Sequence, residues 1–196
     1  MYDLYGCASR LTKRERDVTN GGQRLKGWRG MQTGDLLFGR RIRQNHALEH
    51  ATVTLLTRQQ PGLAVSARSN SRGFTIFANL DPKLVRRCCD EALYRLRAGE
   101  AALAIHPNCG TNLAVGMSLA MIGSLFGLTA LRPRTRVASA VCSAFTGLAM
   151  ARPLGRLVQR HITTLPELHD VRIISVGSRR WWGRRVVEVL TAAEAR

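Results

Sequence analysis

Apolar residues recur at helical spacing in two parts of the chain, with strand-like segments on either side. Between residues 42 and 58, apolar side chains recur at helical spacing among good helix formers. This pattern predicts an amphipathic helix that ends before Pro61-Gly62. A second helix is predicted between Asp81-Pro82 and Gly99, because aspartate caps helices well and proline fits the first helical position. Both helices should bury one apolar face.

Four short segments have the composition of β-strands. Residues 63–68 and 74–78 flank a polar loop closed by glycine, which predicts a β-hairpin. Residues 171–176 and 186–190 predict a second hairpin, whose turn at 179–183 contains two adjacent tryptophans. These tryptophans either anchor the turn at lipid headgroups or cap the hairpin, and the sequence favours neither reading.

The longest apolar run has no charged residue. It covers residues 112–131, and as a helix its 20 residues would span about 30 Å, the thickness of the hydrocarbon core of a bilayer. A charged turn at 132–136 leads into a second run at 137–151, which would span only about 22 Å. The two runs predict a membrane-embedded helical hairpin over residues 112–151.

Small residues are repeated along both runs. Gly123 and Gly127 form a GxxxG pattern, and Ser139, Ser143 and Gly147 follow one another at intervals of four. Such faces let two helices approach closely in lipid, where this kind of packing drives association. The alternative is a hairpin buried in a soluble core or in an oligomer interface, and the same faces allow two copies of the chain to associate.

Together these elements predict an α+β fold. The economical arrangement is one antiparallel sheet of two hairpins, packed with helices, with the transmembrane or membrane-embedded hairpin inserted between the two halves. The basic amphipathic segment 154–162 after this hairpin suits a helix that lies in the membrane interface. We expect residues 31–196 to form a single domain.

The chain is strongly basic, with a net charge of +17 from 30 lysines and arginines against 13 acidic residues. A cytoplasmic face beside anionic membrane lipid is our leading interpretation, and it predicts a cell-membrane protein whose soluble parts are cytoplasmic. A nucleic-acid-binding protein is the second interpretation, but the uncharged run and the 6% aromatic content argue against it. The third interpretation is that the arginine-rich composition has no functional meaning.

The first 30 residues lack an apolar segment of signal-peptide length, and we expect them to form a disordered basic tail. Because patterned sequence begins just after Met31, this methionine is an alternative start of the protein. The five cysteines have no repeated spacing, which indicates a reducing compartment rather than a disulfide framework. Cys88 and Cys89 fall on the apolar stripe of the second helix, so they are expected to pack in the core.

Two short blocks contain most of the metal-binding chemistry. In the block HALEH, His46 and His50 lie four residues apart, so a helix would present both imidazoles on one side. In the block HPNCGT, His106 and Cys109 are also spaced to converge on one point. Two ligands alone rarely hold a zinc ion, so we expect both blocks to meet in one site. The donor set suits a divalent metal, above all Zn²⁺, although Fe²⁺ and Mn²⁺ stay open.

Glu49 is the candidate catalytic residue of this site. A carboxylate three residues after His46 can bind the metal, orient a ligand or act as a general base that activates water. We therefore expect a metal-dependent hydrolase at the membrane surface. The alternatives are a non-catalytic membrane protein with a structural metal and a buried cluster of polar side chains without metal. His161 and His169 lie outside both blocks and are interpreted as surface residues.

The HxxEH block resembles the motif of the inverzincin proteases over five residues. Those enzymes need a further glutamate ligand on a downstream helix, for which Glu91 and Glu100 are available in poor contexts. A broader resemblance covers residues 31–190. HALEHAT, HPNCGTNLAV, the apolar hairpin and RPLGRLVQRHITT are similar to a family of small bacterial membrane proteins of unknown function, and to predicted metal-dependent membrane enzymes. This resemblance implies a shared site at His46, Glu49, His50, His106 and Cys109, and no particular reaction.

Overall fold

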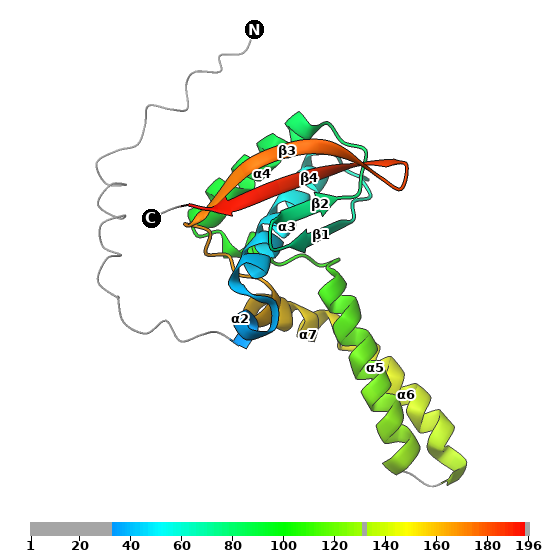
Figure 1. Cartoon of the computed structure of the whole chain (residues 1–196). Coiled ribbons are helices and arrows are strands. Elements are labelled where there is room, and N and C mark those ends of the chain that lie inside the picture. The colour runs from blue at the N-terminus through cyan, green and yellow to red at the C-terminus, as the bar shows by residue number, and fades with distance from the viewer. Residues whose placement is uncertain (1–32, 131–132, 195–196) are drawn as a thin grey trace, which may run out of the picture. The chain divides into compact units, whose positions relative to one another are not determined.

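A computed structural model describes residues 33–130 and 133–194 (Figure 1). The predicted tail at 1–30, the question of a start at Met31 and part of the charged turn lie outside these residues. The helical elements, in chain order, are α2 (Thr33–Phe38), α3 (Arg40–Gln59), α4 (Pro82–Arg97), η2 (Ala101–Ala104), α5 (Gly110–Ala130), η3 (Pro133–Thr135), α6 (Arg136–Ala149), α7 (Ala151–Val158) and η4 (Gln159–Thr163). The strands are β1 (Ala67–Asn70), β2 (Gly73–Ile76), β3 (Val171–Trp181) and β4 (Arg184–Ala193).

The four strands form one antiparallel sheet in the order β1-β2-β4-β3. This confirms the predicted α+β class and the pairing of two hairpins in a single sheet. The hairpins join through β2 and β4, where Gly73 lies opposite Leu190. A Cβ atom at Gly73 would lie only 1.9 Å from the backbone oxygen of Val189, so this close approach of two strands requires glycine.

The strand ends differ from the predicted ones because both turns are tighter than expected. The first hairpin turns through Ser71 and Arg72 alone, so β1 reaches Asn70 instead of ending at Arg68. The second turns through Trp182 and Gly183, and β3 continues five residues beyond its predicted end at 176. The turn was predicted at 179–183, but Trp182 has a positive φ of 49°, which a bulky side chain rarely adopts, so the pattern did not place the turn at these two residues.

The core lies between the inner face of the sheet and the helices α3 and α4. Phe74 and Ile76 of β2 are buried there, as is Leu48 of α3. Cys88 and Cys89 are buried in the same core, as their place on the apolar stripe predicts. Burial raises the pKa of the Cys89 thiol to about 12, so this cysteine stays protonated and serves packing rather than chemistry.

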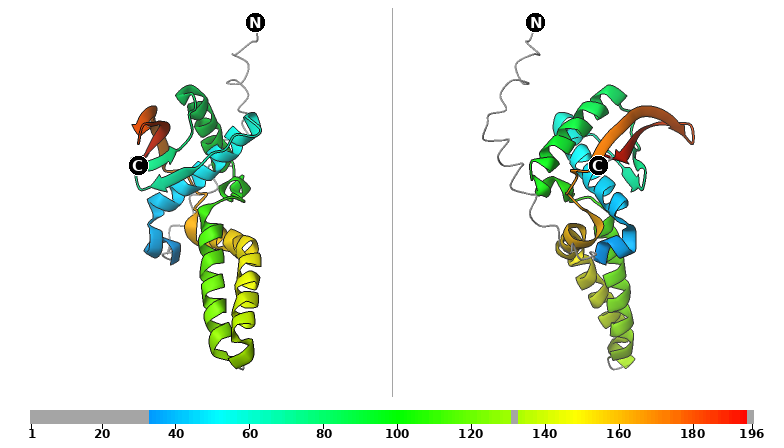
Figure 2. Two further views of the ribbon diagram at one scale, coloured as in Figure 1. Left: turned by 90° about the vertical axis from the view of Figure 1, so that its right-hand side faces the viewer. Right: turned by 60° about the vertical axis from the view of Figure 1, so that its left-hand side comes forward.

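Helices α5 and α6 form a close-packed hairpin, and they lie side by side in every view (Figure 2). Small residues make the contact: a Cβ atom at Gly127 would lie 2.5 Å from the backbone nitrogen of Ala140, and one at Gly147 would lie 2.6 Å from the carbonyl carbon of Leu119. The second helix stops at Ala149, and α7 follows at an angle of 49°. Pro153 explains the break, because proline cannot donate the hydrogen bond that would continue α6.

The outer surface of this hairpin is apolar and exposed. Met117, Phe126 and Phe145 are each at least 60% exposed. Helix α5 is long and apolar enough to cross a membrane over Gly110–Thr129, and only 17% of that window is buried within the described residues. The core helix of a soluble domain would be mostly buried, so the described part of the chain does not supply the covering that this surface requires.

Replacing Gly127 by leucine is expected to push α5 away from α6, because the new side chain would meet the backbone of α6 rather than a movable side chain. Overpacking of this kind costs about 1–3 kcal/mol. The measurement is the thermal unfolding midpoint of the full chain in detergent, with Thr129→Leu as control, because Thr129 is exposed on the same helix. Equal midpoints for the two variants would remove the close-packing argument.

Candidate metal centre

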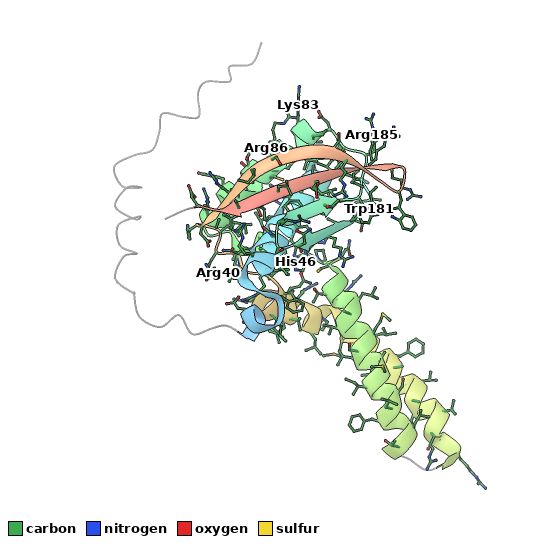
Figure 3. All side chains as sticks on the ribbon, viewed as in Figure 1. Arg40, His46, Lys83, Arg86, Trp181 and Arg185 are labelled. Carbon is green, nitrogen blue, oxygen red and sulfur yellow. The ribbon has the colours of Figure 1, made fainter. Side chains whose placement is uncertain are left out.

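The two histidines of the HALEH block are carried by α3. They lie one turn apart on the side of the helix that faces the loop before α5, and their ring centroids are 4.3 Å apart. His50 is buried and His46 is half-buried. Figure 3 shows His46 between the sheet and the beginning of α5. The site therefore lies at the base of the apolar hairpin.

Both imidazoles are oriented by backbone carbonyl groups. The Nδ1 atom of His46 lies 3.1 Å from the carbonyl oxygen of Thr163, and Nδ1 of His50 lies 2.7 Å from that of Ala104. Because a carbonyl oxygen only accepts, each Nδ1 carries the proton and donates it. The Nε2 atom of each neutral ring is then left with its lone pair. This tautomer is the one with which metal-binding histidines commonly present Nε2 to an ion.

Cys109 reaches the histidines from the turn that precedes α5. Its Sγ lies 3.5 Å from Nε2 of His46, and it accepts a hydrogen bond of 3.4 Å from the backbone N–H of Thr111. Ligand atoms of His46, His50 and Cys109 all lie within 4.8 Å of one another. This separation agrees with the expected spacing of about 3–5 Å for ligands of one ion. The two blocks therefore meet, and the three side chains form a group that could hold a metal.

His106 lies beside this group without belonging to it. Its ring centroid is 5.7 Å from that of His50, and its Nδ1 accepts a hydrogen bond of 3.3 Å from the backbone N–H of Asn108. His106 is half-exposed and lines the same cavity as the other three side chains. Its predicted role as a ligand stays a prediction.

Two polar residues that sequence reasoning missed hold the turn with His106 and Cys109 in place. Gln159 accepts a hydrogen bond from the backbone N–H of His106 and donates one to Asn112. Asn112 in turn donates to the carbonyl oxygen of Pro107 over 2.6 Å. Both side chains are buried, and Gly155 leaves room for Asn112 at the contact between α5 and α7. Their only sequence signal was polarity at the border of apolar segments.

Glu49 is buried on α3 beside the cluster and lines the same cavity, which has a volume of about 460 Å³. One carboxylate oxygen, Oε2, has no hydrogen-bond partner among the described residues. Burial raises the pKa of Glu49 from 4.5 to about 7, and hydrogen bonding with the Ser69 side chain opposes the shift. A carboxyl group with this pKa can both accept and release a proton near neutral pH.

Burial also keeps the imidazoles neutral. It lowers the pKa of His50 to about 3, with a further contribution from neighbouring His46, and it lowers the pKa of His46 and His106. Burial raises the pKa of the Cys109 thiol. Metal ligation needs neutral imidazole and thiolate, so the histidines are ready to bind a cation at neutral pH, whereas Cys109 would release its proton as the metal binds.

These shifts predict how the stability of the metal-free protein depends on pH. Between pH 4.5 and 7 folded Glu49 binds a proton that the unfolded chain has lost, so its contribution falls as pH rises. Between pH 3 and 6.5 unfolded His50 binds a proton that the folded chain lacks, so its contribution falls as pH falls. Between pH 4.5 and 6.5 the two effects oppose each other.

Glu49→Gln removes only the first of these effects. Over that window, the unfolding free energy of the variant should rise with pH more steeply than that of the parent chain, by about 1.4 kcal/mol per pH unit. Denaturant unfolding in detergent with a chelator present measures both slopes. Parallel pH profiles would show that Glu49 is ionised in the folded protein.

The other residues considered as ligands lie elsewhere. Glu91 and Glu100 both form ion pairs with Arg95 at the exposed side of α4, so neither supplies the further ligand of an inverzincin site. His161 and His169 are exposed and stand outside the His-His-Cys group.

The structure defines an α+β protein whose antiparallel sheet and packed helices support a His-His-Cys cluster at the start of an apolar helix. Residues 41–176 match DUF6391, a domain of unknown function, and the chain belongs to this family. An uncharacterised protein of Picosynechococcus sp. is 38% identical over 141 residues, which cover 66% of this chain and 67% of that protein. No solved structure matches the chain.

Proposed function

We propose that this chain is a membrane-bound, zinc-dependent hydrolase with its site at the membrane surface. The observation that carries the proposal is the convergence of His46, His50 and Cys109 in a cavity that also contains the unpartnered carboxylate oxygen of Glu49. Three protein ligands leave a fourth zinc position open, which is the arrangement of catalytic rather than structural sites.

Each residue then has a defined task. His46 and His50 hold the metal through Nε2 while the carbonyl oxygens of Thr163 and Ala104 fix their rings. Cys109 supplies the third, softer ligand. Zinc, when bound, supplies a Lewis acid that lowers the pKa of water and polarises a substrate carbonyl. Glu49 takes a proton from the attacking water and delivers it to the leaving group.

Zinc-dependent turnover tests this function. The full chain, purified in detergent, is treated with a chelator and assayed with p-nitrophenyl acetate before and after addition of zinc. Hydrolysis that the chelator abolishes and zinc restores is the expected result. Zinc binding without any zinc-dependent hydrolysis would contradict the catalytic role.

A structural metal is the second candidate function, and the position of His106 favours it. The centroid of this ring lies 5.7 Å from that of His50, and a His106 ring turned toward the group would offer a fourth nitrogen to the ion. Four protein ligands would close the site and tie α3 to the base of the hairpin. In that case His106→Ala would weaken zinc binding as strongly as His50→Ala does.

We also propose that lipid covers the α5–α6 hairpin. The exposed apolar surface of the hairpin supports this proposal, because stable soluble proteins rarely expose so large an apolar surface to water. Arg152, Arg156 and Arg160 follow the hairpin, and the turn at 132–136 at its other end also contains three arginines, so the charge counts at the two ends are close. We propose cytoplasmic ends, which would place the metal cavity on the cytoplasmic side. A second copy of the chain is the alternative covering.

The membrane assignment predicts how the protein fractionates. Expressed full-length chain should sediment with membranes, resist washing with high salt and alkaline carbonate, and enter solution only with detergent, because its attachment is apolar rather than ionic. Immunoblots of each fraction measure this distribution. Recovery of the chain as an oligomer in the detergent-free soluble fraction would contradict lipid as the covering.

A further inference from the structure

We infer that the substrate of this site is an extended polypeptide segment that pairs with the free edge of β1. The inference rests on the proposed hydrolase function and adds the class of substrate to it. Its basis is the position of an unpaired strand edge along one wall of the cavity that contains the metal-binding group.

Among the residues that the structure describes, β1 is the last strand on one side of the sheet, so only one of its edges is paired there. Neighbouring residues of an antiparallel strand direct their backbone groups alternately toward and away from the partner strand. The backbone N–H of Phe77 donates to the carbonyl oxygen of Ser66, which marks Ser66 as a residue that faces β2. By alternation, Ala67 and Ser69 direct their N–H and C=O groups to the free edge.

The free edge of β1 runs along the metal cavity. Five consecutive residues, 65–69, line the cavity on this side. The face of a strand presents only every second residue, so a run of consecutive lining residues indicates a strand that lies edge-on to the cavity. Cys109 and Thr111 line the cavity from the turn before α5, and His46, Glu49 and His50 line it from α3.

An exposed strand edge binds an extended chain through backbone hydrogen bonds, in the mode of β-strand addition. The outward groups of Ala67 and Ser69 offer two donors and two acceptors, which a polypeptide satisfies and a small ester or a lipid chain does not. The four residues of β1 extend about 13 Å, enough to align a segment of similar length. A carbonyl group of that segment then lies beside the His-His-Cys group and Glu49.

The reaction is hydrolysis of one peptide bond, with water as the only co-reactant. The water oxygen forms a bond to the carbonyl carbon and the bond from that carbon to nitrogen breaks. Glu49 accepts a proton from the water and transfers it to the leaving nitrogen, so the products are one carboxylic acid and one amine. Neither oxidation nor reduction takes place.

The test uses proline, which removes a backbone N–H. Ala67→Pro deletes an outward donor of β1 without touching the hydrogen bonds to β2. Ser178→Pro is the matched control: β3 is the opposite edge of the sheet, and Ser178 is a non-bonded partner of Val187, so its N–H also points outward. Zinc content and unfolding midpoint are measured for both, so that a folding defect is recognised.

Zinc-loaded full chains in detergent are assayed with fluorescently labelled, reduced and alkylated casein as an unfolded polypeptide, and with p-nitrophenyl acetate. We expect the parent and Ser178→Pro to cleave casein. Ala67→Pro should raise KM for casein by about tenfold or more, which corresponds to the loss of a backbone hydrogen bond in an ordered pairing, while ester hydrolysis is unchanged.

The remaining outcomes separate the two proposals. Zinc-dependent ester hydrolysis without cleavage of casein, or casein cleavage that Ala67→Pro leaves unchanged, overturns pairing with β1 and leaves the hydrolase function standing. Absence of zinc-dependent hydrolysis of either substrate overturns the hydrolase function and the inference with it. If Ala67→Pro fails to fold, Val65→Pro decides the same question, because the alternation that places Ser66 toward β2 directs the N–H of Val65 outward along the same wall of the cavity.

Discussion

Replacing Glu49 by glutamine is expected to lower zinc-dependent turnover by about 10²–10⁴-fold while the bound zinc remains. The amide has nearly the shape of the carboxyl group but cannot accept a proton from water. Since Glu49 is not one of the three side chains whose ligand atoms converge, its loss should leave the metal in place. The measurement pairs kcat for p-nitrophenyl acetate with zinc content for the same preparation.

Glu91→Gln is the matched control for this experiment. Glu91 is an exposed residue of α4 that pairs with Arg95, so the same substitution there should change neither turnover nor zinc content. Equal turnover for Glu49→Gln and the parent chain would exclude Glu49 as the base. Loss of zinc from Glu49→Gln would make Glu49 a ligand rather than a base.

Much of the fold could be predicted because hydrophobic periodicity reports directly on burial. The predicted helix at 42–58 corresponds to α3, and the cap at Asp81-Pro82 marks the start of α4, where Asp81 accepts a hydrogen bond from the N–H of Lys83. The turns could not be predicted in detail. Trp182 adopts its positive φ in the two-residue turn that closes the long pairing of β3 with β4, and its residue type does not indicate this conformation.

The convergence of His46, His50 and Cys109 was predictable for a different reason. His46 and His50 are fixed relative to each other by one helix, and the chemistry of zinc demands further ligands, for which Cys109 was the available sulfur near a histidine. The sequence did not indicate that Cys109 would join the converging group while His106 would lie beside it. It depends on the turn before α5, which Gln159 holds through the backbone of His106, and Gln159 is more than 50 residues away in sequence.

The sequence also did not predict that β1 would be an edge strand of the sheet. Strand order decides which strand is left unpaired, and the order β1-β2-β4-β3 depends on the pairing of β2 with β4 across more than 100 residues. The local pattern at 63–78 predicts only a hairpin. The position of its outer strand beside α3 and the turn before α5 is a property of the folded chain.

The second large expected effect is a loss of zinc affinity when any one of the three converging side chains is removed. His50→Ala leaves two protein ligands, and Cys109→Ser replaces a soft thiolate by a weak hydroxyl donor. Either change should weaken zinc binding by more than about tenfold, since replacing even a residue that only orients a ligand lowers metal affinity by about 10–100-fold. Zinc at about 100 times its Kd stabilises the parent chain by about 2.7 kcal/mol, and these variants should lose that stabilisation.

The most direct measurement is the zinc content of the purified full chain after dialysis against a competing chelator, determined by mass spectrometry of the metal. The parent chain should retain about one zinc ion per protein, as one group of three ligands predicts. His169→Ala and Cys142→Ser, both exposed and outside the cluster, should retain as much. His46→Ala, His50→Ala and Cys109→Ser should each lose it. Zinc bound equally by all six proteins, or by none of them, would contradict a metal centre at His46, His50 and Cys109.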